Sequence, residues 1–321
     1  MKRAFLAFNP ASGRFPPRSH VERTAKILRM QGWQLRVEQT QSGEHITQLA
    51  RQAAQEGMEA FFIAGGDGSI NKAVAGLLGS KTALGVLPAG TSNVWAKELG
   101  LVGLSLTRWQ AIEESARRLA EADVHLVDVG LCNGIPFLLW AGVGLDAFVV
   151  HHIEPRERWE KHFAVVQYLT TTVWSASFWP GINIRVSIDG QQVSGHYLLA
   201  VISNIHLYAG GIANLSPDAR LDDGMMDLWL FKGETLGDTV QRMWDLYSGR
   251  HHQSDQIIHY PFRSLSLEAD STIYIQMDGD PAPAQNPLLI EVYSKALPVL
   301  IPQNTPHQLF EHTSTIPMDK T

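Results

Sequence analysis

The chain has 321 residues, of which 45% are hydrophobic and 18% charged, and its formal net charge is −6. This balance is typical of a globular protein with one large or two smaller domains, and it lacks the basic excess that nucleic-acid-binding proteins carry. The only cysteine, Cys132, excludes an intrachain disulfide framework and indicates a reducing compartment, so we expect a cytoplasmic protein that binds no nucleic acid.

Neither of the two most suggestive apolar stretches is long enough for a targeting signal or a membrane span. The N-terminal run covers only residues 4–8, whereas a signal peptide needs about 7–15 apolar residues. The most apolar stretch, residues 136–150, contains Asp146 and is shorter than the roughly 18 residues of a spanning helix. We therefore expect a soluble protein that touches a membrane only at its surface.

Strands and helices alternate along the first hundred residues. Short apolar runs predict strands at 3–8, 33–40, 60–64 and 83–90. Helical spacing of apolar residues predicts helices at about 21–32, 46–57 and 70–78, and another from residue 91. This alternation predicts a parallel sheet covered by helices on both faces, with a ligand site beyond the carboxyl ends of the strands.

After about residue 124 the pattern changes to successive strands. They are predicted at 123–130, 135–142, 181–188, 196–203, 226–231, 256–269, 272–279 and 288–294, with helices near 158–176 and 236–249. Strands in this sequence predict an antiparallel sandwich or barrel. We expect an α/β domain at 1–126, a β-sandwich domain at 127–294 and a loose tail at 311–321. Residues 295–310 are a candidate segment for return to the first domain.

Three of the four predicted strands in the first half end in turns with unusual residues. The turns read NPASG (9–13), GGDGS (65–69) and PAGTSN (88–93). Glycines bring bare backbone close to an anion, and successive N–H groups at a helix start bind phosphate. Asp67 indicates an accompanying cation, most simply Mg²⁺ bound with a nucleotide. Neither the P-loop nor the dinucleotide-binding fingerprint occurs in the chain.

These motifs, in this order, resemble those of the diacylglycerol kinase catalytic family. The match continues with GLDA (144–147), DDGMMD (222–227) and MDGDP (277–281), so the resemblance extends over nearly the whole chain. It implies an N-terminal domain like those of NAD kinase and phosphofructokinase, followed by a lipid-binding β-sandwich. It also implies an ATP- and Mg²⁺-dependent kinase that phosphorylates a lipid hydroxyl.

The resemblance also implies a set of site residues. Those expected to bind the nucleotide are Asn9, Ser12, Gly13, Thr40, Gly65, Gly66, Asp67, Gly68, Ser69, Ile70, Asn71, Thr91 and Asn93. Asp67 and Asp128 would belong to the Mg²⁺ site and its water network. A second, mainly structural cation would be held by Asp223 and by the backbone carbonyls of Arg220 and Met225. Asp278 or Asp280 would be the general base, in addition to the catalytic role of Asp67.

Three positions depart from the pattern of this family. Val94 replaces an aspartate of the metal–water network, and Asp280 replaces the usual glutamate. The shorter side chain at 280 withdraws the carboxylate by about 1 Å, and a misplacement of that size can cost ~10²-fold in rate. Lys72 stands where many relatives carry glutamate, so it is either an added phosphate contact or a solvated helix residue.

The acceptor is less well defined by the sequence. Diacylglycerol is the default, with sphingoid bases, monoacylglycerol and phosphatidylglycerol as further acceptors to test. The aromatic segment 158–181 is a candidate for peripheral membrane contact or for a core helix. Two alternatives stay open: a soluble-substrate kinase like NAD kinase, and a non-catalytic nucleotide or lipid sensor, which Val94 and Asp280 motivate. Self-association is also left open.

Overall fold

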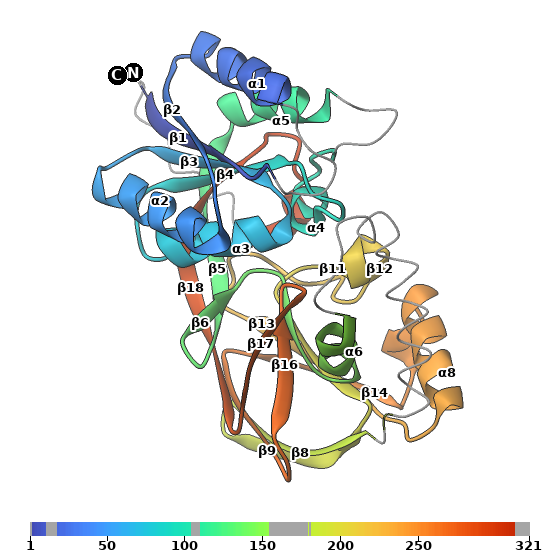
Figure 1. Cartoon of the computed structure of the whole chain (residues 1–321). Helices are drawn as coiled ribbons and strands as arrows, with labels where there is room; N and C mark the ends of the chain where they lie inside the picture. Colours follow the sequence, from blue (N-terminus) through green and yellow to red (C-terminus); the bar gives the residue numbers. More distant parts are fainter. Residues whose placement is uncertain (1, 11–17, 104–109, 154–178, 180, 312–321) are drawn as a thin grey trace. The chain divides into compact units, whose positions relative to one another are not determined.

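The computed structural model describes residues 2–10, 18–103, 110–153, 179 and 181–311 (Figure 1). The chain divides into two compact units. Unit 1 contains Met1–Val129, Leu221–Asp223 and Ser294–Thr321, and unit 2 contains Gly130–Arg220 and Gly224–Tyr293. Ser12 and Gly13, most of the aromatic segment 158–181 and the tail from residue 312 lie outside the described residues.

Unit 1 contains a parallel sheet in the order β2-β1-β3-β4, followed by the second half of β18. The strands are β1 (Lys2–Phe8), β2 (Trp33–Gln39), β3 (Ala60–Gly65), β4 (Ala83–Pro88) and β18 (Leu288–Ile301). Every residue of β3 and β4 is buried, as expected for central strands covered on both faces. The second half of β18 joins this sheet in parallel to β4, where Val299 pairs with Leu84.

Helices cover both faces of the unit 1 sheet. They are α1 (Arg18–Met30), α2 (Gly43–Gln55), α3 (Asp67–Leu77), α4 (Val94–Glu98) and α5 (Ala111–Ala120). In Figure 1, α2 and α3 lie together on one face, and α1 and α5 lie together on the other. The buried side of α2 consists of Ile46, Leu49, Ala50 and Ala53, the apolar spacing from which the helix was predicted. The sequence did not predict α5.

Unit 2 is a β-sandwich. One sheet has the antiparallel order β14-β13-β10-β7-β16-β17, and the other contains β9, β8, β15 and the first half of β18. The new strands are β7 (Trp140–Gly144), β8 (Ile182–Ile188), β9 (Gln191–Tyr197), β10 (Leu199–Ser203), β13 (Met226–Phe231), β14 (Ile257–Phe262), β15 (Ser264–Ala269), β16 (Ile273–Met277) and β17 (Asp280–Gln285). Apolar side chains from both sheets form one buried core.

The remaining elements complete the fold. They are β5 (Asp123–Cys132), β6 (Ile135–Phe137), the β11–β12 pair (Leu207–Tyr208 and Ala213–Asn214), α6 (Leu145–Ile153), α8 (Leu236–Tyr247) and the turns η2 (Ala209–Gly211), η3 (His251–Gln253) and η4 (His307–Leu309). Among the residues that the structure describes, no helix combines the length and apolar character needed to cross a membrane.

The fold class predicted from the sequence is confirmed: a parallel-sheet α/β part is followed by an antiparallel β-sandwich. Three single strands were predicted wrongly. Residues 135–142 contain all of β6 and the start of β7, residues 196–203 divide between β9 and β10, and residues 256–269 divide between β14 and β15. The proline-rich β17, which lies between two predicted strands and was not itself predicted as one, is an edge strand, where missing N–H groups are tolerated. The helix predicted at 158–176 lies outside the described residues.

Candidate active site

The carboxyl ends of three parallel strands meet at one edge of the unit 1 sheet. Phe8 of β1 pairs with Ala64 of β3, and Gly65 of β3 pairs with Pro88 of β4. β2 and β3, the next two strands along the chain after β1, lie on opposite sides of β1, so the strand order reverses between β1 and β3. Open α/β sheets bind their ligands at such a topological switch point. The three turns that the sequence singled out therefore start next to one another at this edge.

The Gly-Gly-Asp-Gly turn leads directly from β3 into α3. Gly66 is the N-cap of α3, and as a glycine it has no side chain with which to cap the helix. The first N–H groups of a helix have no partner within the helix, and they lie at the positive end of its dipole. The start of α3, including the half-buried Gly68, thus has the chemistry of a phosphate-binding turn.

The glycines of these turns also permit close packing between two loops. A Cβ atom on Gly90 would lie 2.4 Å from the Cα of Gly66, and a Cβ atom on Gly65 would lie 2.6 Å from the Cβ of Ser69. The turn after β3 and the turn after β4 therefore touch backbone to backbone. This contact requires glycine at Gly90, whatever the turn binds, and it is tight at Gly66, where a Cβ atom would lie 3.2 Å from the Cα of Gly90.

Asp67 connects the same two turns through its carboxylate. One oxygen, Oδ2, accepts a hydrogen bond from the N–H of Val94 at 3.0 Å, and Oδ1 accepts one from the N–H of Trp95 at 3.1 Å. The carboxylate therefore caps the N-terminus of α4. Desolvation raises the pKa of Asp67, opposed by these two hydrogen bonds and by the charge of Lys97. Desolvation in turn lowers the pKa of Lys97.

Asn9 and Thr40 lie at the same edge. The Asn9 side-chain amide donates to the Ser69 hydroxyl at 3.2 Å, which joins the first turn to the second. The Thr40 hydroxyl donates to the carbonyl of Phe8 at 3.2 Å, and the Thr40 N–H donates to the same carbonyl at 2.9 Å. The structure thus brings Asn9, Ser69 and Thr40 to the ends of β1, β2 and β3.

The third turn is closed by Asn93. This residue has a φ of +49°, its Oδ1 accepts from the N–H of Gly90 at 2.7 Å, and its Nδ2 donates to the Gly90 carbonyl at 2.7 Å. Asn93 is buried, whereas Thr91 in the same turn is exposed. Ile70 and Asn71 are buried on α3. Of these four residues, Thr91 is therefore the one that the solvent reaches most freely.

Two of the sequence departures have definite surroundings. Val94 is 1% exposed, and the carboxylate of Asp67 binds its backbone N–H. The stem of Lys72 lies beside the start of α2, because a Cβ atom on Gly43 would be 3.3 Å from the Lys72 Cγ. The hydroxyl of Thr47 donates to the Lys72 carbonyl at 2.8 Å. The Lys72 stem therefore packs against α2.

Asp128, expected in the metal network, is fully buried in unit 1. Its Oδ1 accepts from the N–H of Lys295 at 2.6 Å, and its own N–H donates to the Leu221 carbonyl at 2.6 Å. Lys295 has a φ of +51°, an unfavourable conformation for a side chain larger than glycine. The Asp128 carboxylate therefore anchors β18 at the residue where its backbone turns.

The segment expected to hold a structural cation is a bend at residues 221–224. Within it, Asp222 is buried and accepts from the N–H of Glu311 at 2.6 Å, while Asp223 is half-buried. Arg220 is exposed and Met225 is half-buried. The described residues contain no group of three or more His, Cys, Asp or Glu side chains placed to hold a metal ion.

The two candidate bases of unit 2 have different surroundings. Asp278 is 7% exposed and its carboxylate accepts three backbone hydrogen bonds, from Leu138 (2.9 Å), Leu139 (2.8 Å) and Trp140 (3.2 Å). Asp280 is exposed at the start of β17. Leu138 and Leu139, whose N–H groups Asp278 binds, lie between β6 and β7, which explains why the predicted strand 135–142 is broken.

Unit 2 also contains an apolar cavity of about 360 Å³. Its lining side chains, almost all apolar, include Leu199, Phe231, Val240, Met243, Trp244 and Tyr247. Helix α8 contributes the largest share of the lining, whereas β10 and β13 contribute one residue each, Leu199 and Phe231. A cavity of this size and character is suited to an apolar chain rather than to a charged nucleotide.

Sequence reasoning did not assign two buried polar residues near this cavity. Asp146, which belongs to the GLDA motif and lines the cavity, accepts a hydrogen bond at 2.7 Å from the Gln276 side chain. Gln276 is 1% exposed, and its Oε1 accepts from the N–H of Gly279 at 2.8 Å. Gln276 therefore links Asp146 to the turn between Asp278 and Asp280. The GLDA motif was a signal for Asp146, but no local pattern marks Gln276.

Comparisons with known proteins agree with both halves of the fold. The model of the diacylglycerol kinase catalytic domain matches residues 3–132, and that of the YegS C-terminal NAD kinase beta sandwich-like domain matches residues 140–301. A solved structure titled a diacylglycerol kinase from Bacillus anthracis str. Sterne superposes with a TM-score of 0.73 and 20% identity. The match covers 95% of this chain and 98% of that one.

Curated relatives match over most of their length. The diacylglycerol kinase of Bacillus subtilis (strain 168) is 27% identical over 282 residues, which are 87% of this chain and 90% of the relative. A Shewanella frigidimarina protein named "Probable lipid kinase YegS-like" is 24% identical over 291 residues, 89% of this chain and 90% of the relative. With both family models matched in order along its length, the chain belongs to the diacylglycerol kinase family of lipid kinases.

Proposed function

We propose that this protein transfers the γ-phosphoryl group of ATP to a hydroxyl group of a lipid, with Mg²⁺ as cofactor and diacylglycerol as the default acceptor. The observation that carries this proposal is the apolar cavity of about 360 Å³ in unit 2. A soluble acceptor such as NAD needs polar and charged groups around it, whereas acyl chains need apolar side chains. The cavity therefore favours a lipid over the soluble substrate of an NAD kinase.

The nucleotide is assigned to the edge of unit 1 at which β1, β3 and β4 end. The start of α3 at Gly66–Gly68 fits the phosphates, because its N-cap glycine has no side chain to bind the first N–H groups of the helix and leaves bare backbone for an anion to approach. Thr91, exposed on the third turn, is the hydroxyl best placed for an added contact. Asn9 and Ser69 hold the first two turns together, and we assign them to the same binding edge.

Mg²⁺ prefers one or two carboxylates together with phosphate oxygens, and Asp67 is the carboxylate at the phosphate-binding turn. Each of its oxygens accepts one N–H and retains capacity for a further partner, so the residue fits the role. Mg²⁺ bound with the nucleotide would neutralise charge on the phosphates. Asp128, and a second cation at Arg220, Asp223 and Met225, stay part of the proposal.

We assign the role of general base to Asp280 and a positioning role to Asp278. A base must approach the acceptor hydroxyl and accept its proton as the new bond to phosphorus forms. Asp280 is exposed, whereas the carboxylate of Asp278 is engaged by three backbone N–H groups. Asp278 would hold the turn that carries Asp280.

The test is phosphorylation from labelled ATP with diacylglycerol, phosphatidylglycerol, sphingosine and NAD offered separately, the lipids in detergent micelles. We expect label in a lipid product, with diacylglycerol the best acceptor, and loss of transfer when EDTA removes Mg²⁺. The variant Ala213→Phe, which fills the cavity, should raise the KM for the lipid at least about tenfold and leave the KM for ATP unchanged.

Two outcomes would overturn the proposal. Label in NAD and not in any lipid would favour the soluble-substrate kinase. Binding of ATP and Mg²⁺ without transfer to any component of a total lipid extract would favour a sensor. If Ala213→Phe changed neither KM, the cavity would not be the acceptor site.

A further inference from the structure

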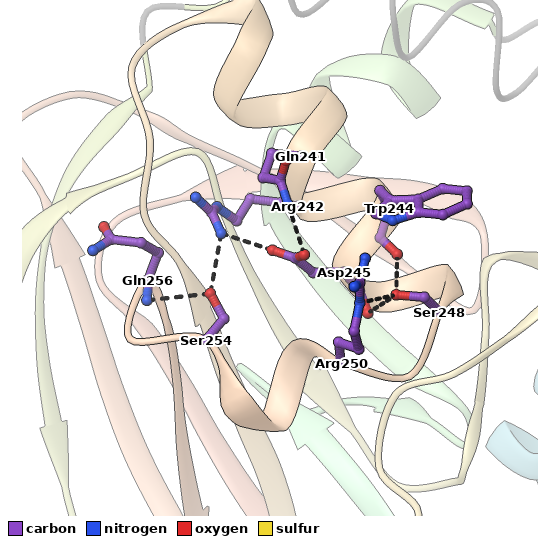
Figure 2. A network of polar contacts seen from close by, with 8 residues as sticks. All are labelled: Gln241, Arg242, Trp244, Asp245, Ser248, Arg250, Ser254 and Gln256. Carbon is purple, nitrogen blue, oxygen red and sulfur yellow. Dashed lines mark hydrogen bonds and ion pairs between the residues drawn. The ribbon is translucent and has the colours of Figure 1, made fainter.

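Polar contacts lie along one side of helix α8 and bind it to the loop before β14. Thr235 and Asp238 form a capping box at its start. Near its end, Arg242 donates to Asp245 at 2.8 Å and to the Ser254 hydroxyl at 3.0 Å, and both partners of this ion pair are largely buried. Figure 2 shows this network, with the ring of Trp244 projecting away from it. The contacts therefore determine which side of α8 faces outward.

The outward side of α8 is apolar. Leu236, Val240, Trp244 and Tyr247 recur at helical spacing and are 38%, 49%, 54% and 68% exposed. Ile212, which precedes β12, is 40% exposed and lines the same cavity as three of them. We call these five residues the α8 strip. A contiguous exposed strip that includes Trp and Tyr marks an interaction surface.

The α8 strip and the cavity are continuous. Val240, Trp244, Tyr247 and Ile212 belong to both, so the cavity opens within the strip. A partner that covers the strip would therefore cover the cavity mouth. A protein partner would close this route, whereas a lipid layer would supply the apolar chains that fit the cavity.

The charges around the strip specify what kind of lipid surface fits. Residues 232–256 contain three cationic side chains and four anionic ones: Lys232, Arg242 and Arg250 against Glu234, Asp238, Asp245 and Asp255. The segment lacks the cationic excess with which peripheral helices bind anionic lipids. Its contact with a membrane should depend on insertion of apolar and aromatic side chains at the interface.

We infer that the α8 strip docks onto the surface of a lipid bilayer by apolar insertion, independently of anionic lipids, and places the cavity mouth against the bilayer. The route for the acceptor rests on the lipid-kinase function proposed above, but the docking itself does not. The interaction surface is thereby assigned to α8.

The experiment is co-sedimentation of the full chain with phosphatidylcholine vesicles in the absence of ATP. The double variant Val240→Ser/Tyr247→Ser should weaken vesicle binding at least about tenfold. The matched control Leu289→Ser/Tyr293→Ser removes two similarly exposed side chains of β18, 52% and 53% exposed, and should bind like wild type. Binding by wild type should change less than about threefold between low and high salt.

Three results would overturn the inference: equal binding by the strip variant and wild type, binding that requires anionic lipid and is lost at high salt, or a strip variant that changes the sedimentation mass. The last result would identify the strip as a self-association surface. Because no ATP is present, failure of the kinase proposal leaves this measurement unaffected. Transfer to a detergent-solubilised lipid without vesicle binding would overturn the docking alone.

Discussion

At the scale of single residues, the candidate site combines carboxylates with different roles. Asp67, Asp128 and Asp278 each bind backbone N–H groups of a distant segment, so each holds two parts of the fold together. Asp280 differs because it is exposed. A buried carboxylate that loses its charge leaves its N–H partners poorly satisfied, whereas the loss of charge from an exposed one costs little free energy of unfolding. Replacing each aspartate by the isosteric asparagine can therefore distinguish a structural carboxylate from a catalytic one.

Asp278→Asn should mainly lower the stability of the fold, whereas Asp280→Asn should mainly lower the rate of phosphoryl transfer. An asparagine at 278 has one acceptor oxygen for three N–H donors, so we expect a loss of about 1–3 kcal/mol in the free energy of unfolding. Asp280→Asn should change it by less than about 0.5 kcal/mol, yet lower kcat ~10²-fold or more. Urea unfolding and lipid-kinase assays measure both. A stable, inactive 278 variant beside an active 280 variant would exchange the two assignments.

The residue types at the nucleotide edge were predictable because the glycines and polar residues lie in short turns after apolar runs. The residues that they contact in the folded chain were not predictable. Asp67 was expected to face Mg²⁺, and the structure adds that it caps α4, 27 residues further along the chain. Gly66 and Gly90 were expected to expose backbone to phosphate, and they also pack on each other. Such contacts between distant segments leave no local sequence signal.

At the scale of elements, periodicity located the helices and strands that have an apolar face. It did not find where a tertiary contact breaks or extends a strand. Asp278 interrupts the apolar run at Leu138 and Leu139 by binding their N–H groups. Pairing with β16 makes a strand of the proline-rich segment that begins at Asp280. The first effect comes from a residue far away in the sequence. The second comes from strand pairing that a proline-rich sequence does not indicate.

Gly142 in β7 packs closely against the buried pair of Asp146 and Gln276. A Cβ atom on Gly142 would lie 2.0 Å from the Asp146 Oδ2 and 2.6 Å from the Gln276 Nε2. Gly142→Ala should therefore displace the buried Asp146–Gln276 pair and cost about 1–3 kcal/mol in unfolding free energy. Gly237→Ala in α8 is the matched control, because its Cβ would approach only Thr235, at 3.6 Å. Thermal unfolding measures both, and equal melting temperatures would contradict the packing argument.

At the scale of the whole molecule, the two units are connected by strands that belong to both. β5 begins in unit 1 and ends in unit 2, and β18 begins in unit 2 and ends in unit 1. The second half of β18 adds Leu297, Val299, Leu300 and Ile301 to the buried core, and Leu309 follows in η4. The α/β unit therefore depends on residues far beyond its first 129.

A chain that ends after Tyr293 should lose the fold of unit 1, although it keeps every nucleotide-edge residue. It lacks five buried side chains worth roughly 8–15 kcal/mol together at about 1.5–3 kcal/mol each, comparable to the whole stability of a domain. It also lacks the Lys295 N–H that Asp128 binds. Hydrogen exchange should show unprotected amides in β3 and β4, whereas a chain ending after Glu311 should keep them protected. Full protection in the shorter chain would mean that residues 2–129 fold without β18, and its buried side chains would then contribute little.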